Sequence, residues 1–454
     1  MRDKVATLRG SERRLRVLIA PDAFKGSLDA MAAAQAIAAG WRRQRPDDQL
    51  DLCPMADGGD GFGPVLAQWL GAEPRYCDTV DAAGRPRRAR WWWAPAPRLP
   101  MPVAHLPVAA ASAPASIAIV ESAEAIGLAW LPPALRHPLP LDGAAPRPVH
   151  PSPPAQGDPD SGGLDSSGLN SNGLESRGLD SRGLAPLLLA AAAAGVERLL
   201  LGLGGSATND GGFGLARALG WRFFDADGAA IQRWGDLERL ERVEPPPQPP
   251  LLPQLVIAVD VRNPLLGPEG ATAIYGPQKG LTAQQLPRAE ACLRRLAHGL
   301  ESRFPGVAER PGSGAAGGLG YGLQVFCGGQ LRAGAELVAE LCGLEARVEA
   351  ADLVIGGEGR FDRQSLMGKG TGRLLQRAQR TGRCSLLLVG QLEEEALDRA
   401  RAEAALQGCA VAARALVPDL TDLTQAGAAQ ALWLERLAEQ AAADLDALSP
   451  AAAP

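Results

Sequence analysis

Short apolar runs alternate with longer Ala- and Leu-rich segments along much of the chain. The run RVLIA starts at Arg16 and leads through PDAFKGS into LDAMAAAQAIAAGWRRQ, where apolar residues recur at near-helical spacing. This order predicts a strand, a turn that contains Lys25 and Gly26, and a helix with Ser27 as its N-cap.

The same succession returns three times. LDLCPM leads through ADGGDG into FGPVLAQWL, ERLLLGL through GGSATNDGG into FGLARALGW, and ADLVIGGEG through RFDRQSLMGKG into TGRLLQRAQR, before a further strand, CSLLLVG. Strands that alternate with helices predict a parallel α/β fold. Ligands in such folds bind at the carboxyl ends of the strands, which is where these loops lie.

Between about residue 80 and residue 315 the pattern is less regular. IAIVESAEAIGL reads as a strand followed by a turn into a helix, but residues 141–163 are rich in Pro, Gly and Asp, which predicts disorder. A five-residue repeat, GLDSS-GLNSN-GLESR-GLDSR, follows. Units this short do not stack into a solenoid, so residues 141–180 are predicted to form a tolerated surface loop. A partner-binding linker is the alternative.

Composition narrows the class of protein. The chain has 454 residues, enough for two domains or one large one, and a formal net charge of -5, which argues against a general nucleic-acid or polybasic membrane surface. The apolar runs are too short or too broken to predict a transmembrane helix. Residues 1–15 are charged and lack an apolar segment, so we expect a disordered extension, or a start codon assigned too early, and not a secretory signal.

The seven cysteines are scattered without a CxxC pair, which is typical of reduced core thiols in a cytoplasmic enzyme. Lysine is more informative, because only four of the 46 basic residues are lysine. Three of them, Lys25, Lys279 and Lys369, each precede a glycine within a distinctive motif. A compact ammonium suits a small anionic group better than a planar guanidinium does. Chance retention is the alternative.

Two glycine-rich loops carry carboxylates. ADGGDG presents Asp57 and Asp60, a pair suited to a divalent cation or to a hydroxyl proton, although Asp-Gly also favours plain turns. GGSATNDGG places Asn209 and Asp210 just before a predicted helix N-terminus, where backbone N–H groups favour an anion.

Further charged residues follow later strands. Asp260 ends a predicted strand, Lys279 lies in a Gly-Pro loop, and GGEGRFDRQSLMGKG gathers acidic and basic groups within twelve residues. Phosphoryl transfer needs this combination of metal ligands, a cradle and cations, whereas structural ion pairs would explain only some of it. Arg363 stands where a P-loop would need its first glycine, and the protein-kinase motifs HRD and DFG are missing.

In order, the motifs APDAFKGSL, ADGGDG, LGGSATNDGG, DVRNPLLGPEGA, YGPQKG, GAAGGLG and ADLVIGGEGRFD resemble those of the glycerate kinase family, which includes the bacterial glycerate 2-kinases. The likeness runs from Arg16 to about residue 445. It implies phosphorylation of D-glycerate with ATP and Mg²⁺, with 2-phosphoglycerate as the favoured product. The chain departs from the family pattern at Ile355-Gly356-Gly357 and after Lys369, which could alter nucleotide contacts.

The resemblance also implies an architecture. A flavodoxin-like parallel-sheet domain would form from residues 16–80 and 312–446, and a second α/β domain from residues 81–311 would be inserted between its halves. The site would lie in the cleft between the two domains, and the oligomeric state is not readable.

Matching the motifs residue by residue assigns candidate roles. The catalytic candidates are Lys25, Asp60, Asp210 and Lys369, with Asp210 ahead of Asp60 for orienting or deprotonating the acceptor hydroxyl. The candidates for binding substrate or phosphate are Asp22, Gly26, Ser27, Gly204, Gly205, Ser206, Asn209, Asp260, Lys279, Arg360 and Asp362. The candidates for holding Mg²⁺ are Asp57 and Glu358. A kinase of another sugar acid, a non-catalytic hydroxy-acid binding protein, and a 3-phosphoglycerate product all stay open.

Overall fold

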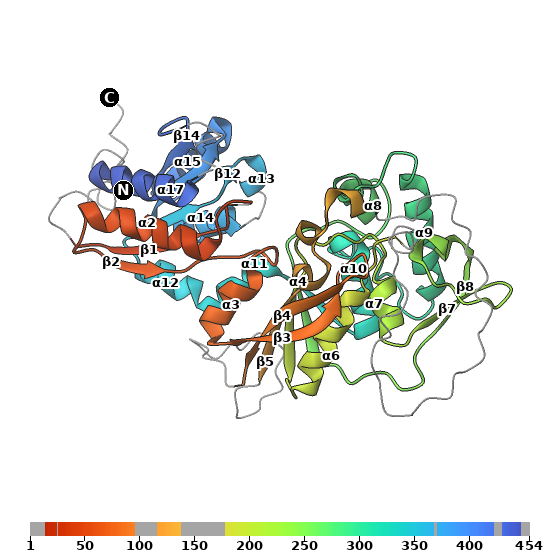
Figure 1. The fold of residues 1–454 in the computed structure, drawn as a ribbon. Helices are drawn as coiled ribbons and strands as arrows, with labels where there is room; N and C mark the ends of the chain where they lie inside the picture. Colours follow the sequence, from red (N-terminus) through yellow and green to blue (C-terminus); the bar gives the residue numbers. More distant parts are fainter. Residues whose placement is uncertain are drawn as a thin grey trace.

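The computed structural model describes residues 14–24, 26–95, 116–137, 178–366, 370–421 and 429–445. Lys25 and Lys369, most of the predicted loop at 141–180 and residues 1–13 therefore lie outside the described residues. Figure 1 shows two lobes, with helices α3 and α11 where the lobes meet.

One sheet, in the first lobe, is built from both ends of the chain. Its strands are β1 (Arg16–Pro21), β2 (Gln49–Leu52), β11 (Leu353–Gly357), β12 (Arg360–Phe361), β13 (Cys384–Leu392) and β14 (Val411–Val417). All of its pairings are parallel: β2, β1, β11 and β13 are neighbours in that order, and β12 and β14 both pair with β13. With β14 as fifth strand, this is the flavodoxin-like order 2-1-3-4-5.

Helices cover both faces of this sheet. They are α2 (Ala30–Gln44), α12 (Leu344–Ala350), α13 (Arg363–Leu366), α14 (Gly370–Arg380), α15 (Glu394–Leu406) and α17 (Gln430–Ala443). Because side chains alternate along a strand, Val17 and Ile19 pack in the cluster that holds α2 and α17, whereas Leu18 and Ala20 pack into the opposite core. Burial on both faces explains why β1 reads as a continuous apolar run.

The second sheet is mixed. Its strands are β3 (Glu73–Val80), β4 (Pro86–Ala94), β5 (Ile117–Glu121), β6 (Arg198–Gly202), β9 (Gln254–Val259) and β10 (Gln330–Ala333), in the order β10-β9-β6-β5-β4-β3. The four strands β10, β9, β6 and β5 are parallel, and the hairpin of β4 and β3 continues the sheet antiparallel. Strands β7 (Arg222–Asp225) and β8 (Leu240–Glu244) form a separate antiparallel pair.

The helices around the second sheet come from most of the chain length. They are α3 (Phe62–Leu70), α4 (Ser122–Ile126), α6 (Ala185–Ala193), α7 (Phe213–Ala218), α8 (Ala271–Tyr275), α9 (Leu286–Leu300), α10 (Ala315–Cys327) and α11 (Gly334–Cys342). Short 3₁₀ turns lie at Leu128–Trp130, Pro133–Leu135, Arg182–Leu184, Trp234–Arg239 and Pro277–Lys279.

One hydrophobic cluster runs from the first sheet to the second. It contains Leu18 of β1, Phe62 of α3, Ile119 of β5, Leu200 of β6 and Leu337 of α11, all less than 2% exposed. The two lobes therefore share a core through α3 and α11, and these helices fix the distance between the two sheets (Figure 1).

The predicted α/β class, with a parallel sheet made from both chain ends, is confirmed, but several local details differ. Asp29, and not Ser27, caps α2, because its carboxylate accepts the Ala32 N–H at 2.7 Å while Ser27 Oγ donates to the Phe24 carbonyl. Leu15, predicted to belong to a disordered extension, is fully buried.

The second sheet contains residues that the sequence prediction placed in a surface loop or in the first domain. Leu179 packs in the core of the second sheet, so the end of the predicted loop at 141–180 is structural. Residues 73–80 and 330–333, placed by the sequence prediction in the first domain, are strands β3 and β10 of the second sheet. Strand β3 pairs with its neighbour β4 in a hairpin, whereas β10 pairs with β9, more than 70 positions earlier, which local patterns do not reveal.

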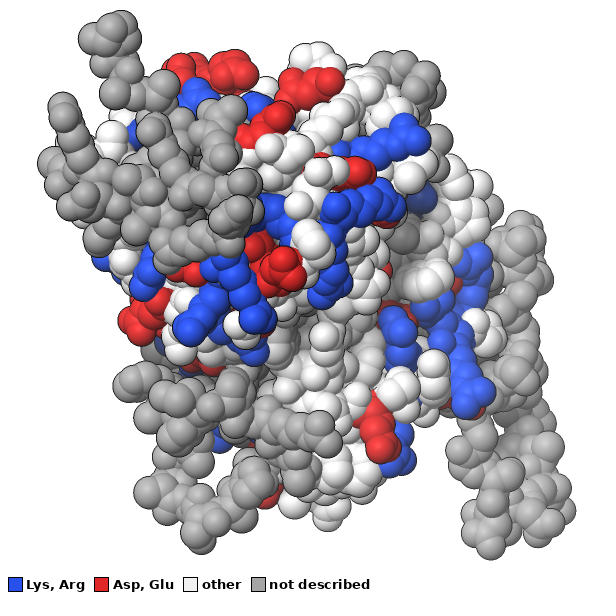
Figure 2. Space-filling view, turned by 90° about the vertical axis from the view of Figure 1, so that its left-hand side faces the viewer, with Lys and Arg blue, Asp and Glu red and all other residues white. Residues whose placement is uncertain are grey.

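Two surface properties complete the description. Within the described ranges, no helix combines the length and apolar character needed to cross a membrane. Figure 2 shows basic and acidic side chains interspersed on the face it presents. The described residues of that face therefore do not form a surface of one charge sign alone.

Candidate functional site

The two predicted glycine-rich loops touch each other at the carboxyl ends of the second sheet's strands. The Gly204 N–H donates to the Gly58 carbonyl at 3.1 Å. A Cβ placed on Gly204 would come 2.2 Å from the Gly59 Cα, so the loops approach backbone to backbone. ADGGDG, which follows β2 of the first sheet, is thus part of the same site as GGSATNDGG, which follows β6.

The Asp60 side chain, which belongs to ADGGDG, lies against the other loop, GGSATNDGG, at Gly205. Gly205 has a φ of +67°, and a Cβ there would be 2.5 Å from Asp60 Oδ1. The nearby Asp57 accepts the Gly59 N–H at 2.9 Å, which shapes the turn between the two carboxylates. A side chain at Gly205 would displace the Asp60 carboxylate, so the glycine is required by both backbone and contact.

Lys279 fixes the loop that faces Asp60. The Lys279 side chain is buried, and its ammonium donates to Ser206 Oγ at 3.0 Å and to the Thr208 carbonyl at 2.7 Å. Burial lowers the pKa of Lys279 to about 7, and Asp210 opposes that shift. The positive charge that the glycine-rich loop lacks in its own sequence is therefore supplied from the turn Pro277–Lys279 of the same lobe.

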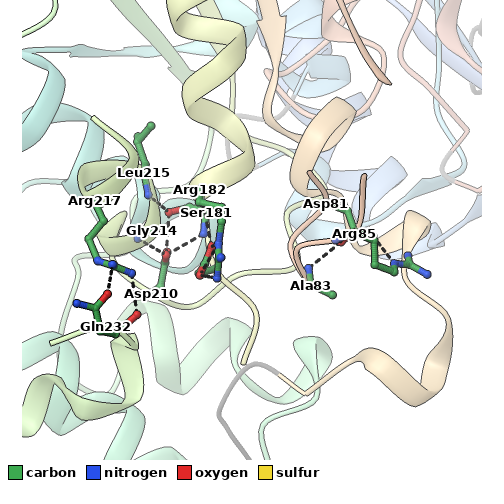
Figure 3. A network of polar contacts seen from close by, with 11 residues as sticks. Asp81, Ala83, Arg85, Ser181, Arg182, Asp210, Gly214, Leu215, Arg217 and Gln232 are labelled. Atoms are coloured by element: carbon green, nitrogen blue, oxygen red, sulfur yellow. Dashed lines mark hydrogen bonds and ion pairs between the residues drawn. The ribbon is translucent and has the colours of Figure 1, made fainter. Parts of the chain in front are cut away.

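Asp210 is held by donors from its own lobe (Figure 3). Its Oδ2 accepts the Ser181 N–H at 2.9 Å, Ser181 Oγ at 2.8 Å and the Gly214 N–H at 2.9 Å, and its Oδ1 accepts the Gly212 N–H at 3.1 Å. Burial raises the pKa of Asp210. The anion predicted at the start of α7 is thus the chain's own Asp210 carboxylate.

Asn209 is buried next to it. Its Nδ2 donates to Thr272 Oγ1 at 3.1 Å, whereas its Oδ1 has no hydrogen-bond donor within the described part of the chain. A buried acceptor of this kind is a candidate ligand contact.

The first sheet brings a second set of predicted residues to the carboxyl ends of its strands. Asp22 follows β1 and Glu358 follows β11. Asp22 lies against the start of α14, since a Cβ on Gly370 would be 3.1 Å from Asp22 Oδ2. Asp362 caps α13 through the Gln364 N–H at 2.8 Å, and exposed Arg360 lies 3.7 Å from it. Both residues therefore lie at this edge of the first sheet, where the sequence predicts substrate or phosphate binding.

Gly26, next to the undescribed Lys25, has a φ of +82° in the turn after β1. Ser27 donates within that same turn to the Phe24 carbonyl at 2.8 Å. Both residues therefore shape the turn that carries Lys25.

Asp260 joins the two lobes. Its Oδ2 accepts the Ala335 N–H of α11 at 2.8 Å, and its Oδ1 lies 3.7 Å from Arg373 on α14, which also pairs with Glu336 at 2.9 Å. Burial raises the pKa of Asp260 to about 7, and the charge of Asp57 adds to the rise. Asp57, Asp260 and the first turn of α14 thus belong to one neighbourhood.

Sequence reasoning missed Glu121, the last residue of β5. Its side chain is buried and accepts the Gly63 N–H at the start of α3. Burial raises the pKa of Glu121 to about 7, and the charges of Glu124 and Asp60 add to the rise. The available signal was the same as for Asp260, an acidic residue at the end of an apolar run.

The carboxylates of the site bear on whether it could hold a divalent cation. Among them, no three or more His, Cys, Asp or Glu side chains are grouped so as to hold a metal ion. Mg²⁺ in phosphoryl-transfer enzymes is usually held by one or two carboxylates together with substrate phosphates, so no all-protein cage is expected. The carboxylates of Asp57 and Glu358 fit that kind of donor set.

Comparisons with known proteins agree with this geometry. The chain matches the glycerate kinase family over residues 17–143 and 165–446. It is 33% identical to the glycerate kinase of Halalkalibacterium halodurans over 90% of this chain and 93% of that protein. It is 34% identical to the glycerate 2-kinase of Escherichia coli over 78% of this chain and 80% of that protein.

A solved structure resembles the fold as a whole. The crystal structure of a protein described as glycerate kinase 2 from Salmonella typhimurium superposes with a TM-score of 0.69 and 31% identity, covering 96% of this chain and 99% of that one. The family match spans both sheets and every loop described above. The chain therefore belongs to the glycerate kinase family and is an enzyme of the kinase class.

Proposed function

We propose that this enzyme transfers the γ-phosphoryl group of ATP to a hydroxyl of D-glycerate, with 2-phosphoglycerate as product. The observation that carries the proposal is the contact between the two glycine-rich loops, which brings Asp60 onto the loop that Lys279 fixes. Phosphoryl transfer depends on positioning and on electrostatic stabilisation, and this arrangement offers a carboxylate beside a backbone cradle. The similarity to the Escherichia coli glycerate 2-kinase favours position 2.

Asp60 is our candidate for orienting or deprotonating the acceptor hydroxyl, ahead of Asp210. The Asp210 oxygens already accept hydrogen bonds from two backbone segments, so a substrate hydroxyl would have to displace one of these donors. Asp210 then acts by holding the loop and α7 in place. Asn209, through its buried Oδ1, is the better candidate for a direct substrate contact in this loop.

Lys25 and Lys369 are our candidates for binding phosphate or the carboxylate of glycerate. Lys25 and Lys369, outside the described residues, flank Gly26 and Gly370, and Gly370 starts α14 beside Asp22. The proposal for both lysines rests on these neighbours in the sequence. Lys279 is assigned a different role, because its ammonium donates hydrogen bonds to Ser206 and Thr208 and so orders the loop.

Asp57 and Glu358 are the proposed residues for Mg²⁺. When bound, the ion would neutralise charge on the transferring phosphoryl group. Asp57 is presented by the turn that ends in Asp60, and Glu358 by the end of β11. Asp22 stays a substrate candidate on the same edge of the first sheet.

We further propose that the two lobes are domains divided near Gly71 and Gly343. This division gives β3 and β10 to the second domain with the sheet they belong to. The predicted cleft would then be lined by the carboxyl ends of both sheets, and closure around a small substrate would exclude water. A cytoplasmic location stays a prediction.

The deciding experiment measures ATP turnover with Mg²⁺ and D-glycerate, with enolase as the reporter of product and without phosphoglycerate mutase. Signal without the mutase supports 2-phosphoglycerate, and signal only after adding mutase assigns the product as 3-phosphoglycerate. A panel of hydroxy acids and sugar acids, run by ADP release, tests other acceptors. Folded protein that turns over none of them would support a non-catalytic binding protein.

A matched pair of variants ties the activity to the site. Asp60→Asn should lower kcat by about 10²- to 10⁴-fold, the usual contribution of a positioned proton acceptor. Asp398→Asn changes an exposed carboxylate on α15 and should leave kcat unchanged. Equal activity of both variants would remove Asp60 from its proposed role.

A further inference from the structure

Helix α3 starts without a capping side chain of its own. Its N-cap residue, Gly61, has a φ of 90° and no side chain, yet the first N–H groups of a helix need acceptors. The Glu121 carboxylate, 58 positions further along the chain, accepts the Gly63 N–H. The acceptor for the Gly63 N–H therefore comes from the second sheet, whereas the Phe62 N–H donates to the Gly59 carbonyl of the loop before the helix at 3.2 Å.

The same short segment of β5 and α4 holds the other glycine-rich loop. Glu121 is paired in register with Gly202 of β6, and Ser122 Oγ donates to the Gly204 carbonyl at 3.3 Å. Glu121 thus holds the start of α3, which follows ADGGDG, and Ser122 contacts GGSATNDGG directly.

Packing leaves little freedom at this junction. A Cβ on Gly63 would come 2.1 Å from the Trp92 ring, so the start of α3 lies flat on β4. Asp60 immediately precedes Gly61, which means that the position of its carboxylate follows the position of the helix start. Losing the Glu121 acceptor would release this end of α3 and the turn before it.

The charges around Glu121 are mostly acidic. Burial is the largest cause of the raised pKa of Glu121, which is about 7. The hydrogen bond from the Gly63 N–H lowers this pKa, the charges of Glu124 on α4 and Asp60 in the loop raise it, and the charge of Arg90 on β4 lowers it. Ionised and protonated Glu121 both keep an oxygen for the Gly63 N–H. Ionisation adds repulsion toward Asp60.

We propose that Glu121 is the positioning residue for Asp60: it caps α3 through the Gly63 N–H and thereby holds the Asp57–Asp60 turn against the ends of β5 and β6. The inference rests on the proposed function of Asp60 in phosphoryl transfer. Glu121 itself does not contact the substrate in this assignment.

The test compares Glu121→Ala, which removes the acceptor, with Glu121→Gln, which keeps a carbonyl oxygen at the same place. Glu121→Ala should lower kcat about 100-fold, the order expected for a misplaced catalytic group, with KM for ATP and for the acid within about 3-fold. Glu121→Gln should stay within about 10-fold of the wild type and should lose a pH–rate limb near pH 7. Glu124→Gln, on the next turn, is the matched control and should keep that limb.

Coupling to Asp60 separates positioning from direct catalysis. The double variant Asp60→Asn/Glu121→Ala should be no slower than Asp60→Asn alone, because both changes remove the same contribution. Multiplicative losses would overturn the proposal. So would a Glu121→Gln variant as slow as Glu121→Ala, since that result would make Glu121 a proton-transfer group.

A measurement without substrate keeps the inference independent of the reaction. Amide hydrogen exchange over residues 57–66 should be about 10-fold faster in Glu121→Ala than in wild type and unchanged in Glu121→Gln. Unchanged exchange in Glu121→Ala would overturn the cap. If wild-type protein phosphorylated no acid in the panel while this exchange difference was present, the proposed function would fail and the cap would stand.

Discussion

The Lys279 ammonium donates to the Thr208 carbonyl oxygen at 2.7 Å, and the lysine is buried, with only 4% of its surface exposed. This bond, with the one to Ser206 Oγ, fixes the backbone of the glycine-rich loop that contacts Asp60 at Gly205. An ammonium in that position stabilises a loop geometry at a cost in desolvation. Function and stability should therefore respond in opposite directions to its removal.

Lys279→Met should lower turnover by about 100-fold while leaving the fold intact or more stable. Because burial lowers the pKa of Lys279 from 10.5 to about 7, the unfolded chain binds more protons between these two pH values. Wild-type stability from this group thus rises with pH across that window. The stability gain of Lys279→Met over wild type should be largest below pH 7 and shrink toward pH 10, as measured by urea unfolding. A gain that does not change with pH would contradict the assignment.

Asp260→Asn should stabilise the protein at pH 8 but not at pH 4. The pKa of Asp260 is raised from 3.8 to about 7 in the folded state, so the folded protein binds more protons between these values and loses stability as pH rises through them. A shift of about 3 units corresponds to at most ~4 kcal/mol. Urea unfolding at both pH values checks this, with Asp398→Asn as control; parallel curves for wild type and Asp260→Asn would refute it.

Asp210→Asn and Asp60→Asn should fail in different ways. An amide at position 210 would direct an NH₂ group at donors that now point at a carboxylate, so unfolding free energy should fall by ~2–4 kcal/mol. Asp60→Asn should lose turnover with little change in stability. Thermal unfolding and steady-state kinetics on the two variants decide this. Normal stability of Asp210→Asn would return Asp210 to the list of proton acceptors.

Gly205→Ala should lower turnover as well as stability. Alanine at a φ of +67° costs ~1–2 kcal/mol, and its Cβ would also press on Asp60 Oδ1. Gly228, with a φ of +79° and open space around its Cβ position, is the matched control. Both variants should lose similar stability, but only Gly205→Ala should lose turnover, by about 10-fold or more. Equal kinetics in the two variants would separate Gly205 from the site.

Local patterns predicted the strands and their terminal carboxylates well. The run before Asp260 and the run before Glu358 are buried parallel strands, because such strands are apolar on both faces. The sequence also predicted which polar side chains within one segment lie together, as Asp57 and Asp60 do in ADGGDG. These features depend on residues close together in sequence.

Hydrogen-bond partners that lie far apart in the sequence could not be predicted from local patterns. Glu121 looks like the first residue of a short helix, and its hydrogen bond to Gly63 depends on how two lobes pack. Asp210 looks like a free acid at a helix start until Ser181, 29 positions earlier, is seen to donate to it. The cap of α2 was misplaced by two residues because Ser27 and Asp29 both have acceptor side chains, and only the turn geometry selects Asp29.

The pairing of β1 with β11 has a consequence for synthesis. Arg16 and Asp352, which are hydrogen-bonded in the finished sheet, lie 336 positions apart, so the middle of that sheet stays open while the whole second lobe is being made. At about 5–20 residues per second the wait is roughly 15–70 s. During that interval the apolar edge of β1 is exposed on the ribosome, and chaperone dependence should concentrate there.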